Sequence, residues 1–169
     1  MRLIATALFA AATLAAQSTG PIVGSAKGMY AQIKDSVMRT AQKVPAELYS
    51  YQPTPEIRTF AQLLGHEADG QYEFCSAVTG KPVDKNIEKT VKDKAGIIAA
   101  LKEAFAYCDG AFATMTEADA VSVVNLFGQK MTRVAVMDMN TAHTNEHYGN
   151  LVTYMRLKGI VPPTSEPRK

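Results

Sequence analysis

The chain has 169 residues, of which 47% are hydrophobic and 20% are charged, so it is long enough for one domain with a single buried core. Its 18 basic and 16 acidic side chains nearly cancel. That balance argues against a nucleic-acid-binding protein, which usually carries a concentrated basic surface. Two cysteines are too few for a disulfide-rich scaffold or a four-cysteine zinc site.

The amino terminus has the layout of a secretory signal peptide. A short positive region precedes an apolar run from Leu3 to Ala16, and the small residues at its end offer cleavage after Ala15 or Ala16. The run is too short for a bilayer-spanning helix of about 20 residues. We therefore expect residues 1–16 to be removed and the protein to be exported to the periplasm without a stable membrane anchor. An uncleaved anchor is the alternative interpretation.

The first half of the remaining chain is expected to form two helices. A glycine-containing linker over residues 17–28 precedes a first helix, whose apolar positions begin at Met29 and which Pro45 ends. A second helix is predicted to start with Pro55 at its first position, because proline suits the first turn of a helix. It runs to about Val78.

The second half is expected to form two more helices. A charged connection over residues 81–94 leads to a third helix, where one apolar stripe occupies residues 97–115. The fourth helix covers about residues 131–158, and glycine and proline end it. We find no alternation typical of strands. Residues 29–169 are therefore predicted to form one all-α domain, a helical bundle.

Two of the three histidines share one face of the predicted fourth helix. His143 and His147 are four residues apart, and a helix places them on the same side as Val136 and Leu151. The pair is therefore expected to point into the bundle. A histidine pair with this spacing can supply two ligands to a metal ion.

A zinc protease of the zincin class is not predicted, although that class also uses a histidine pair on one helix. Its pattern is His-Glu-x-x-His, whereas Thr144 follows the first histidine here and Glu146 falls on the flank of the helix.

The third histidine is predicted to meet this pair. His66 lies about 12–15 Å from the start of the second helix, and His147 lies about 16 Å from the end of the fourth, at 1.5 Å per residue. If these helices are antiparallel neighbours, the three imidazoles lie at the same depth. They would then bind one divalent metal ion and leave other coordination positions open. Zinc and nickel are the metals that we favour. The alternative is a set of hydrogen-bonded core histidines without a metal.

The two histidine segments resemble the DinB-like (DinB/YfiT) family, which is unrelated to the translesion polymerase of similar name. The resemblance is strongest over residues 51–66, over residues 143–149 and over residues 154–163, and it extends across most of the chain. It implies a four-helix bundle with up-down-down-up topology and a divalent metal bound by one histidine of the second helix and two of the fourth. The matching positions here are His66, His143 and His147.

The resemblance leaves the reaction open. Relatives in the family include mycothiol-dependent maleylpyruvate isomerase and thiol transferases. Low-molecular-weight thiols are mainly cytosolic, however, which argues against thiol transfer by an exported protein. Our leading hypothesis is a metal-dependent hydrolase or transferase that acts on a small molecule. The alternative is a non-catalytic exported protein that binds a metal or a small ligand. Both leave open whether the chain forms a homodimer.

Several polar residues are candidates for roles around the metal. Asn140 could hydrogen-bond a ligand, or it could be a satisfied core amide. Glu67 could serve as a general base, although we favour a polar partner or a route to solvent for its carboxylate. Arg58 is a candidate anion contact at the mouth of the bundle, and Tyr154 either lines the pocket or belongs to the core.

The two cysteines test the topology. Cys75 and Cys108 each lie about 19–20 residues into their predicted helices, so parallel helices place them at the same depth. Cysteines of exported proteins often pair. If the two helices are diagonal in the bundle, however, the sulfur atoms are too far apart for a disulfide.

Overall fold

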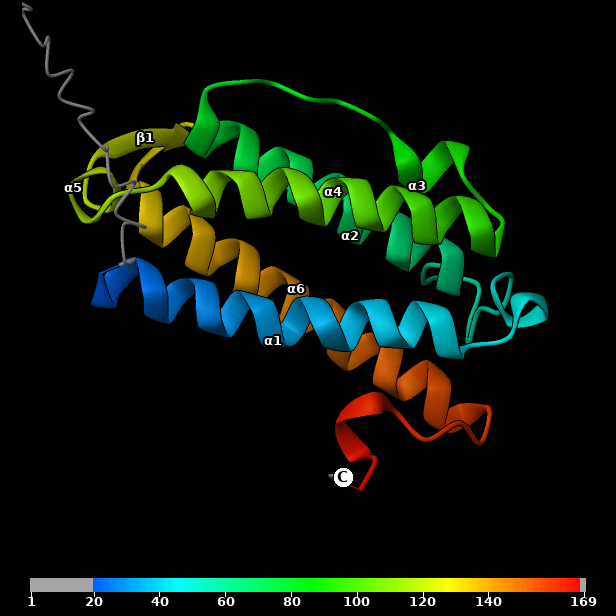
Figure 1. The fold of residues 1–169 in the computed structure, drawn as a ribbon. Coiled ribbons are helices and arrows are strands. Elements are labelled where there is room, and N and C mark those ends of the chain that lie inside the picture. Colours follow the sequence, from blue (N-terminus) through cyan, green and yellow to red (C-terminus); the bar gives the residue numbers. More distant parts are fainter. Residues whose placement is uncertain (1–19, 168–169) are drawn as a thin grey trace, which may run out of the picture.

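The computed structural model describes residues 20–167, and the expected signal peptide lies outside them. Four long helices form a bundle (Figure 1). They are α1 (Pro21–Lys43), α2 (Phe60–Thr79), α4 (Lys94–Thr114) and α6 (Arg133–Leu157). Figure 1 shows α1 and α6 running in one direction and α2 and α4 in the other, which confirms the up-down-down-up bundle.

The order of the helices around the bundle makes α2 a neighbour of both α4 and α6. Helix α2 packs against both α4 and α6, and α1 packs against the same two helices from the other side. The parallel helices α2 and α4 are therefore neighbours, and α1 lies diagonally opposite α2. Aromatic side chains fill the space between them, and Tyr30, Phe60, Phe105 and Phe112 are almost completely buried.

Helix α1 starts earlier than the sequence predicted. The expected linker over residues 17–28 is wrong from Pro21 onward, because the helix begins there with proline in its first turn. Val23 and Ala26 are buried and continue the apolar stripe that Tyr30 belongs to. The glycines of this segment suggested a linker, but burial of that stripe outweighs their low helix propensity.

Helix α2 starts later than predicted, at Phe60 instead of Pro55. The Thr59 hydroxyl accepts a hydrogen bond from the backbone N–H of Gln62, and the Gln62 side chain accepts one from the N–H of Thr59. This capping box satisfies two backbone donors at the helix start, which a start at Pro55 could not do. The predicted end is correct, since Gly80 adopts the left-handed conformation with φ of 68°.

The charged connection between α2 and α4 contains a short helix, α3 (Ile87–Thr90). The Asp69 carboxylate of α2 accepts hydrogen bonds from the backbone N–H groups of Ile87 and Glu88, at 2.8 and 2.9 Å. Gly65 permits this close approach, because a Cβ there would lie 2.8 Å from the Cα of Glu88. Helix α3 is thus fixed one turn from His66.

The expectation that the chain contains no strands is wrong. Strands β1 (Val123–Leu126) and β2 (Gln129–Thr132) form an antiparallel hairpin between α4 and α6. Phe127 and Gly128 both have positive φ, of 51° and 82°, as a tight two-residue hairpin turn requires. The remaining short elements are η1 (Ala46–Leu48), α5 (Glu117–Ala120) and η2 (Pro163–Ser165).

A disulfide joins Cys75 of α2 to Cys108 of α4, with their Cα atoms 5.4 Å apart. The sequence left two possibilities open, and the adjacency of α2 and α4 decides between them. Within residues 20–167, no helix is both long enough and apolar enough to cross a membrane.

Candidate metal centre

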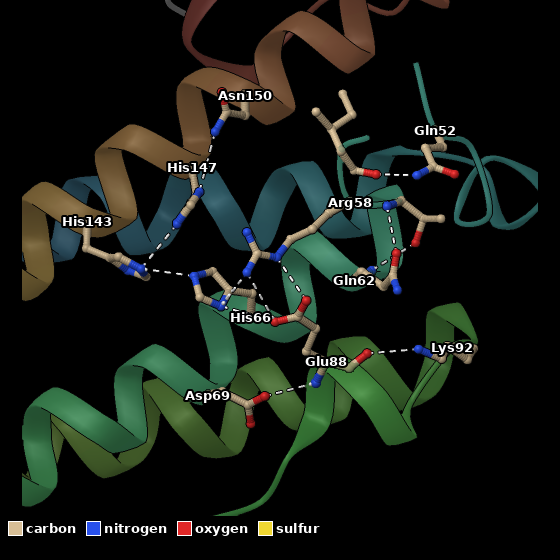
Figure 2. Close-up of polar contacts among 12 residues, drawn as sticks. Gln52, Arg58, Gln62, His66, Asp69, Glu88, Lys92, His143, His147 and Asn150 are labelled. Carbon is tan, nitrogen blue, oxygen red and sulfur yellow. Dashed lines mark hydrogen bonds and ion pairs between the residues drawn. The ribbon is translucent and has the colours of Figure 1, made fainter. Parts of the chain in front are cut away.

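The three histidines of the chain meet between α2 and α6, as the sequence predicted (Figure 2). The Nε2 atom of His143 lies 3.2 Å from Nε2 of His66 and 3.1 Å from Nε2 of His147. One ring nitrogen from each histidine lies within 4.8 Å of the other two. His66 comes from the second turn of α2, and the pair on α6 is one helical turn apart, so antiparallel packing of the two helices creates the cluster.

The spacing of these nitrogens suits a metal ion. Bonds of about 2.1 Å to one metal place two ligand nitrogens about 3.0 Å apart at an octahedral angle and about 3.4 Å apart at a tetrahedral angle. The Nε2–Nε2 distances of 3.2 and 3.1 Å fall between these values. A ring nitrogen of neutral imidazole either carries a hydrogen or presents a lone pair, so Nε2 of His143 cannot donate to one neighbouring Nε2 and accept from the other. A shared cation would satisfy all three lone pairs at once.

The outer nitrogen of His66 has a carboxylate partner. Its Nδ1 lies 3.2 Å from Oε2 of Glu88, and Oε1 of Glu88 accepts a hydrogen bond from Nε of Arg58 at 2.9 Å. A histidine that donates its Nδ1–H to a carboxylate presents the Nε2 lone pair toward a metal. Glu88 is the second residue of α3. The hydrogen bonds that Asp69 accepts from the α3 backbone therefore also help to fix the position of this carboxylate.

The outer nitrogens of the α6 pair also face polar groups. Nδ1 of His147 lies 3.4 Å from the side-chain amide of Asn150, whose oxygen can accept the Nδ1–H when the amide is turned. Nδ1 of His143 lies 3.8 Å from Oε1 of Glu67, which is too long for a hydrogen bond. The His143 ring packs on Gly70, where a Cβ would lie 2.9 Å from its Cε1 atom. His147 thus has a polar neighbour at its outer nitrogen, whereas Nδ1 of His143 is buried without a hydrogen-bond partner among the described residues.

The surroundings keep all three imidazoles neutral. Burial is the largest cause and lowers the pKa of each histidine below its usual value. The pKa of His143 falls to about 4, and the neighbouring His147 adds to the effect of burial there. For His66 the guanidinium of Arg58 acts in the same direction. Neutral imidazole is the form that binds metals.

Glu67 does not find the polar partner that the sequence led us to expect. Its side chain is completely buried, and neither carboxyl oxygen has a hydrogen-bond partner within residues 20–167. The nearby hydroxyl of Thr144 donates its only hydrogen to the carbonyl of Asn140, at 2.9 Å. Burial raises the pKa of Glu67 to about 8, so the carboxyl group is largely protonated at neutral pH.

Asn140 belongs to the core and not to the metal site. Its side-chain amide donates to Oε1 of Gln71 at 2.8 Å, and the Gln71 amide donates to the Thr144 hydroxyl at 3.0 Å. This buried network ties α2 to α6 one turn away from the histidines. The interpretation of Asn140 as a core amide is therefore correct, although its side-chain oxygen has no hydrogen-bond partner among the described residues, and the amide makes no hydrogen bond to a histidine.

A cavity of about 550 Å³ opens beside the cluster. Of the three histidines only His147 lines it. Polar side chains from the segment before α2, from α2, from α3 and from α6 complete the wall, including Arg58, Gln62, Glu88, Asn150 and Tyr154. The Tyr154 hydroxyl donates to the carbonyl oxygen of Arg58 at 2.7 Å, which holds the segment before α2 against α6. Sequence reasoning proposed Arg58 and Tyr154 for this region, and the structure brings both to the cavity.

Two residues of the site were missed. Glu88 lay in a segment that composition marked only as a charged connection, and nothing in its neighbours indicates that it folds back onto α2. Asn150 follows His147 by three residues, so helical spacing could have identified it.

The fold and the site together define a four-helix bundle protein with a three-histidine cluster between its second and last long helices. The sequence profile of the DinB superfamily matches residues 29–151, and the chain belongs to that superfamily. A search among curated proteins found no match.

Two solved structures show the same fold. A DinB-like protein from Bacillus cereus ATCC 10987 is 17% identical, with a TM-score of 0.75 over 83% of this chain and 95% of that one. A DinB-like protein from Bacillus subtilis is 18% identical, with a TM-score of 0.64 over 89% of this chain and all of that one. At these identities the likeness concerns the fold alone.

Proposed function

We propose that the protein binds one divalent metal ion through the Nε2 atoms of His66, His143 and His147. The observation that carries this proposal is the convergence of three neutral ring nitrogens from two helices, at separations of 3.1 and 3.2 Å along the cluster. Membership of the DinB superfamily is in keeping with it.

The donor set disfavours magnesium and calcium, and among the other divalent metals we propose zinc or nickel. All three candidate ligands are imidazoles, which suit zinc, nickel, copper and iron better than magnesium or calcium, because these last two prefer oxygen. Three protein ligands leave coordination positions free, as in catalytic sites, and an ion held there supplies Lewis-acid chemistry.

We further propose that the reaction is a hydrolysis or a group transfer on a small molecule. The cavity beside His147 is large enough for a small substrate, and its wall offers the guanidinium of Arg58 and the amide of Asn150. Arg58 uses its Nε to contact Glu88, which in turn holds His66. The other N–H groups of the guanidinium can orient an anionic group of a substrate. Non-catalytic capture of a small ligand is the alternative use of the same cavity.

The proposal places this chemistry outside the cytoplasm. The amino-terminal pattern predicts export, and the disulfide between Cys75 and Cys108 is of a kind that persists in oxidising compartments such as the periplasm. Sequencing of the protein recovered from the periplasm should give an amino terminus at Ala16 or Gln17. An intact Met1 in a cytoplasmic fraction would contradict export.

Metal analysis of the chelator-stripped and reloaded protein tests the site. We expect one equivalent of zinc or nickel per chain, and we expect His66→Ala, His143→Ala and His147→Ala each to lose most of the affinity. Asn145→Ala is the matched control, because Asn145 is exposed on the same helix between the two histidines and should leave binding unchanged.

Turnover is tested separately, with panels of hydrolase and transferase substrates. We expect activity that requires the metal and is lost in His147→Ala, whose circular dichroism should remain that of a folded bundle. Full metal binding without turnover on any substrate class would favour the non-catalytic alternative. Affinity lost at His143 and His147 but kept at His66 would show that the third ligand is wrong.

A further inference from the structure

A second cavity, of about 440 Å³, lies at the other end of the bundle from the histidines. The end of α2, the last turns of α4 and the first residue of α6 surround it. Val78 in its wall follows His66 by 12 residues, and Arg133 precedes His143 by 10 residues. At 1.5 Å per helical residue, the two sites are about 15–18 Å apart. Nothing in the proposed metal chemistry uses this cavity.

Two cationic side chains line this cavity, Lys81 after α2 and Arg133 at the start of α6. Within residues 20–167, neither of them forms an ion pair. The carboxylate of Asp119 accepts hydrogen bonds from the N–H and the hydroxyl of Thr116, and these lower its pKa. The positive charge of Arg133 lowers the pKa of Asp119 further. Neither cation is therefore in a direct ion pair with a described residue, although the charge of Arg133 acts on the carboxylate of Asp119.

Arg133 also carries an unused donor. Its Nε is buried and has no hydrogen-bond partner among the described residues. A buried donor without a partner costs about 1–3 kcal/mol, so most of them in folded proteins are satisfied by the protein, by water or by a ligand. The terminal Nη groups of the same guanidinium have no hydrogen-bond or ion-pair partner among the described residues either, so an acceptor in the cavity can be bound there.

The hydroxyl groups around the cavity are already occupied. The Tyr107 hydroxyl donates to the backbone carbonyl of Lys81 at 2.6 Å and accepts from the Thr79 hydroxyl at 2.7 Å. The Thr114 hydroxyl donates to the carbonyl of Gly110 at 3.1 Å. The polar groups of the cavity that remain free are therefore the two cationic side chains. They can bind an anion, whereas a cation would find few free acceptors.

The rest of the wall is apolar and made of small or buried groups. Val78, Ala111 and Met115 are buried side chains that face the cavity from α2 and α4. Gly110 leaves open space at its surface, because a Cβ built there would meet nothing within 4 Å. A volume of this size, with apolar walls and a few convergent polar groups, is typical of small-molecule sites.

We infer that this cavity binds a small amphiphilic carboxylate. The carboxylate lies between Lys81 and the terminal Nη groups of Arg133, and the apolar body of the ligand lies along Val78 and Met115. The site is independent of the metal centre, because no residue lines both cavities. It should therefore work in the metal-free protein as well.

Titration of the full chain with octanoate, followed by amide NMR shifts and calorimetry, tests this inference. We expect saturable binding with shifts confined to the ends of α2 and α4 and the start of α6, equal with and without metal. Acetate, which lacks the apolar body, and octylammonium, which has the wrong charge, should each bind at least tenfold more weakly.

Variants separate the two halves of the site. Arg133→Gln and Lys81→Gln should each weaken octanoate binding about tenfold, and Gly110→Leu should abolish it by filling the open space. Gly28→Leu is the matched control, since a Cβ at this exposed helical glycine of α1 also meets nothing within 4 Å. Circular dichroism checks that each variant is folded.

Unchanged octanoate affinity in the doubly substituted Lys81→Gln and Arg133→Gln protein would overturn the inference. So would shifts centred on the histidines, acetate binding as tightly as octanoate, or the absence of saturable binding. None of these outcomes bears on the metal proposal, which is read from metal content.

Discussion

The Nε2 atoms of His66 and His143 lie 3.2 Å apart although 77 residues separate them in the chain. Behind His66, the carboxylate of Glu88 lies 3.2 Å from Nδ1 and turns the ring so that Nε2 points at the cluster. Glu88 is itself held by Arg58 and by the attachment of α3 to Asp69. The packing of α2 against α6 brings the histidines together, and the orientation of the His66 ring depends on polar contacts that begin outside the four long helices.

Replacing Glu88 should weaken the metal site without removing a ligand. We expect Glu88→Ala to lower metal affinity about 10–100-fold, because an unsupported His66 loses its fixed orientation and some basicity. Glu88→Gln keeps an oxygen for the Nδ1–H and should retain more of the affinity. Competition with a chelator of known affinity measures both.

Glu103→Ala provides the control for Glu88, since Glu103 is exposed on α4 and should leave metal affinity unchanged. Equal affinities for Glu88→Ala and the unchanged protein would show that Glu88 does not orient His66.

Metal binding should persist to a lower pH than three ordinary histidines would allow. Unperturbed histidine has a pKa near 6.5, and burial lowers the pKa of all three ligands, to about 4 for His143. Protons therefore begin to compete for the ring nitrogens below pH 6.5, and we expect affinity to remain measurable at pH 6 and to be lost toward pH 4. Metal content after equilibrium dialysis across this range gives the profile. Complete release near pH 6.5 would contradict the burial of these rings.

The same shifts set the acid stability of the metal-free protein. The folded state keeps its histidines neutral, so below pH 6.5 the unfolded chain binds more protons than the folded one. The free energy of unfolding should therefore fall as the pH drops from about 6.5 toward 4. Urea unfolding of the chelator-treated protein at several pH values measures this slope.

The histidine cluster could be predicted because it depends on regular helix geometry. A spacing of four residues places His143 and His147 on one face, and the depth of His66 follows from the length of its helix. Small errors in the helix ends did not matter, since the start of α2 at Phe60 instead of Pro55 leaves His66 within the same helix.

The parts of the site on short elements could not be predicted in this way. Glu88 reaches His66 only because Gly65 lets α3 approach α2 and Asp69 caps it there, and each of these residues is unremarkable alone. The hairpin escaped notice because each of its strands has four residues, too few for a period of two to stand out. Long-range contacts, and not local propensity, determine the structure and position of such segments.

Removing the charge of Glu67 should stabilise the metal-free protein above neutral pH. Its buried carboxyl has a pKa raised to about 8, whereas the carboxyl of the unfolded chain ionises near 4.5. The folded state thus binds the extra proton, and stability falls as the pH rises from about 4.5 to about 8.

We expect Glu67→Gln to gain about 1–3 kcal/mol over the unchanged protein at pH 9 and much less at pH 5, because glutamine does not ionise. Thermal unfolding at both pH values measures the difference. Glu73→Gln, an exposed glutamate of the same helix, is the control. A gain that does not depend on pH would mean that Glu67 ionises normally in the fold.

Loss of the disulfide should lower stability more than the loss of its packing alone. Cys75 and Cys108 are 33 residues apart, and closing a loop of that length removes unfolded-state entropy worth about 3–4 kcal/mol. We expect the Cys75→Ala, Cys108→Ala double variant to unfold at lower urea concentration by about this amount. Chemically reduced protein should show a similar loss, and equal stability of the oxidised and reduced chains would show that the bond does not form.

Phe105 tests the core between α1 and α4. Its side chain is 1% exposed, and its ring contacts Tyr30 edge to face with the ring centres 6.1 Å apart. Phe105→Ala removes this buried ring and leaves a cavity, which should cost about 3–5 kcal/mol in the free energy of unfolding. Met29→Ala, at a side chain that is 53% exposed on α1, should change stability by no more than about 0.5 kcal/mol. A cost below about 1 kcal/mol for Phe105→Ala, within the range of surface substitutions, would show that α4 does not present this face to α1.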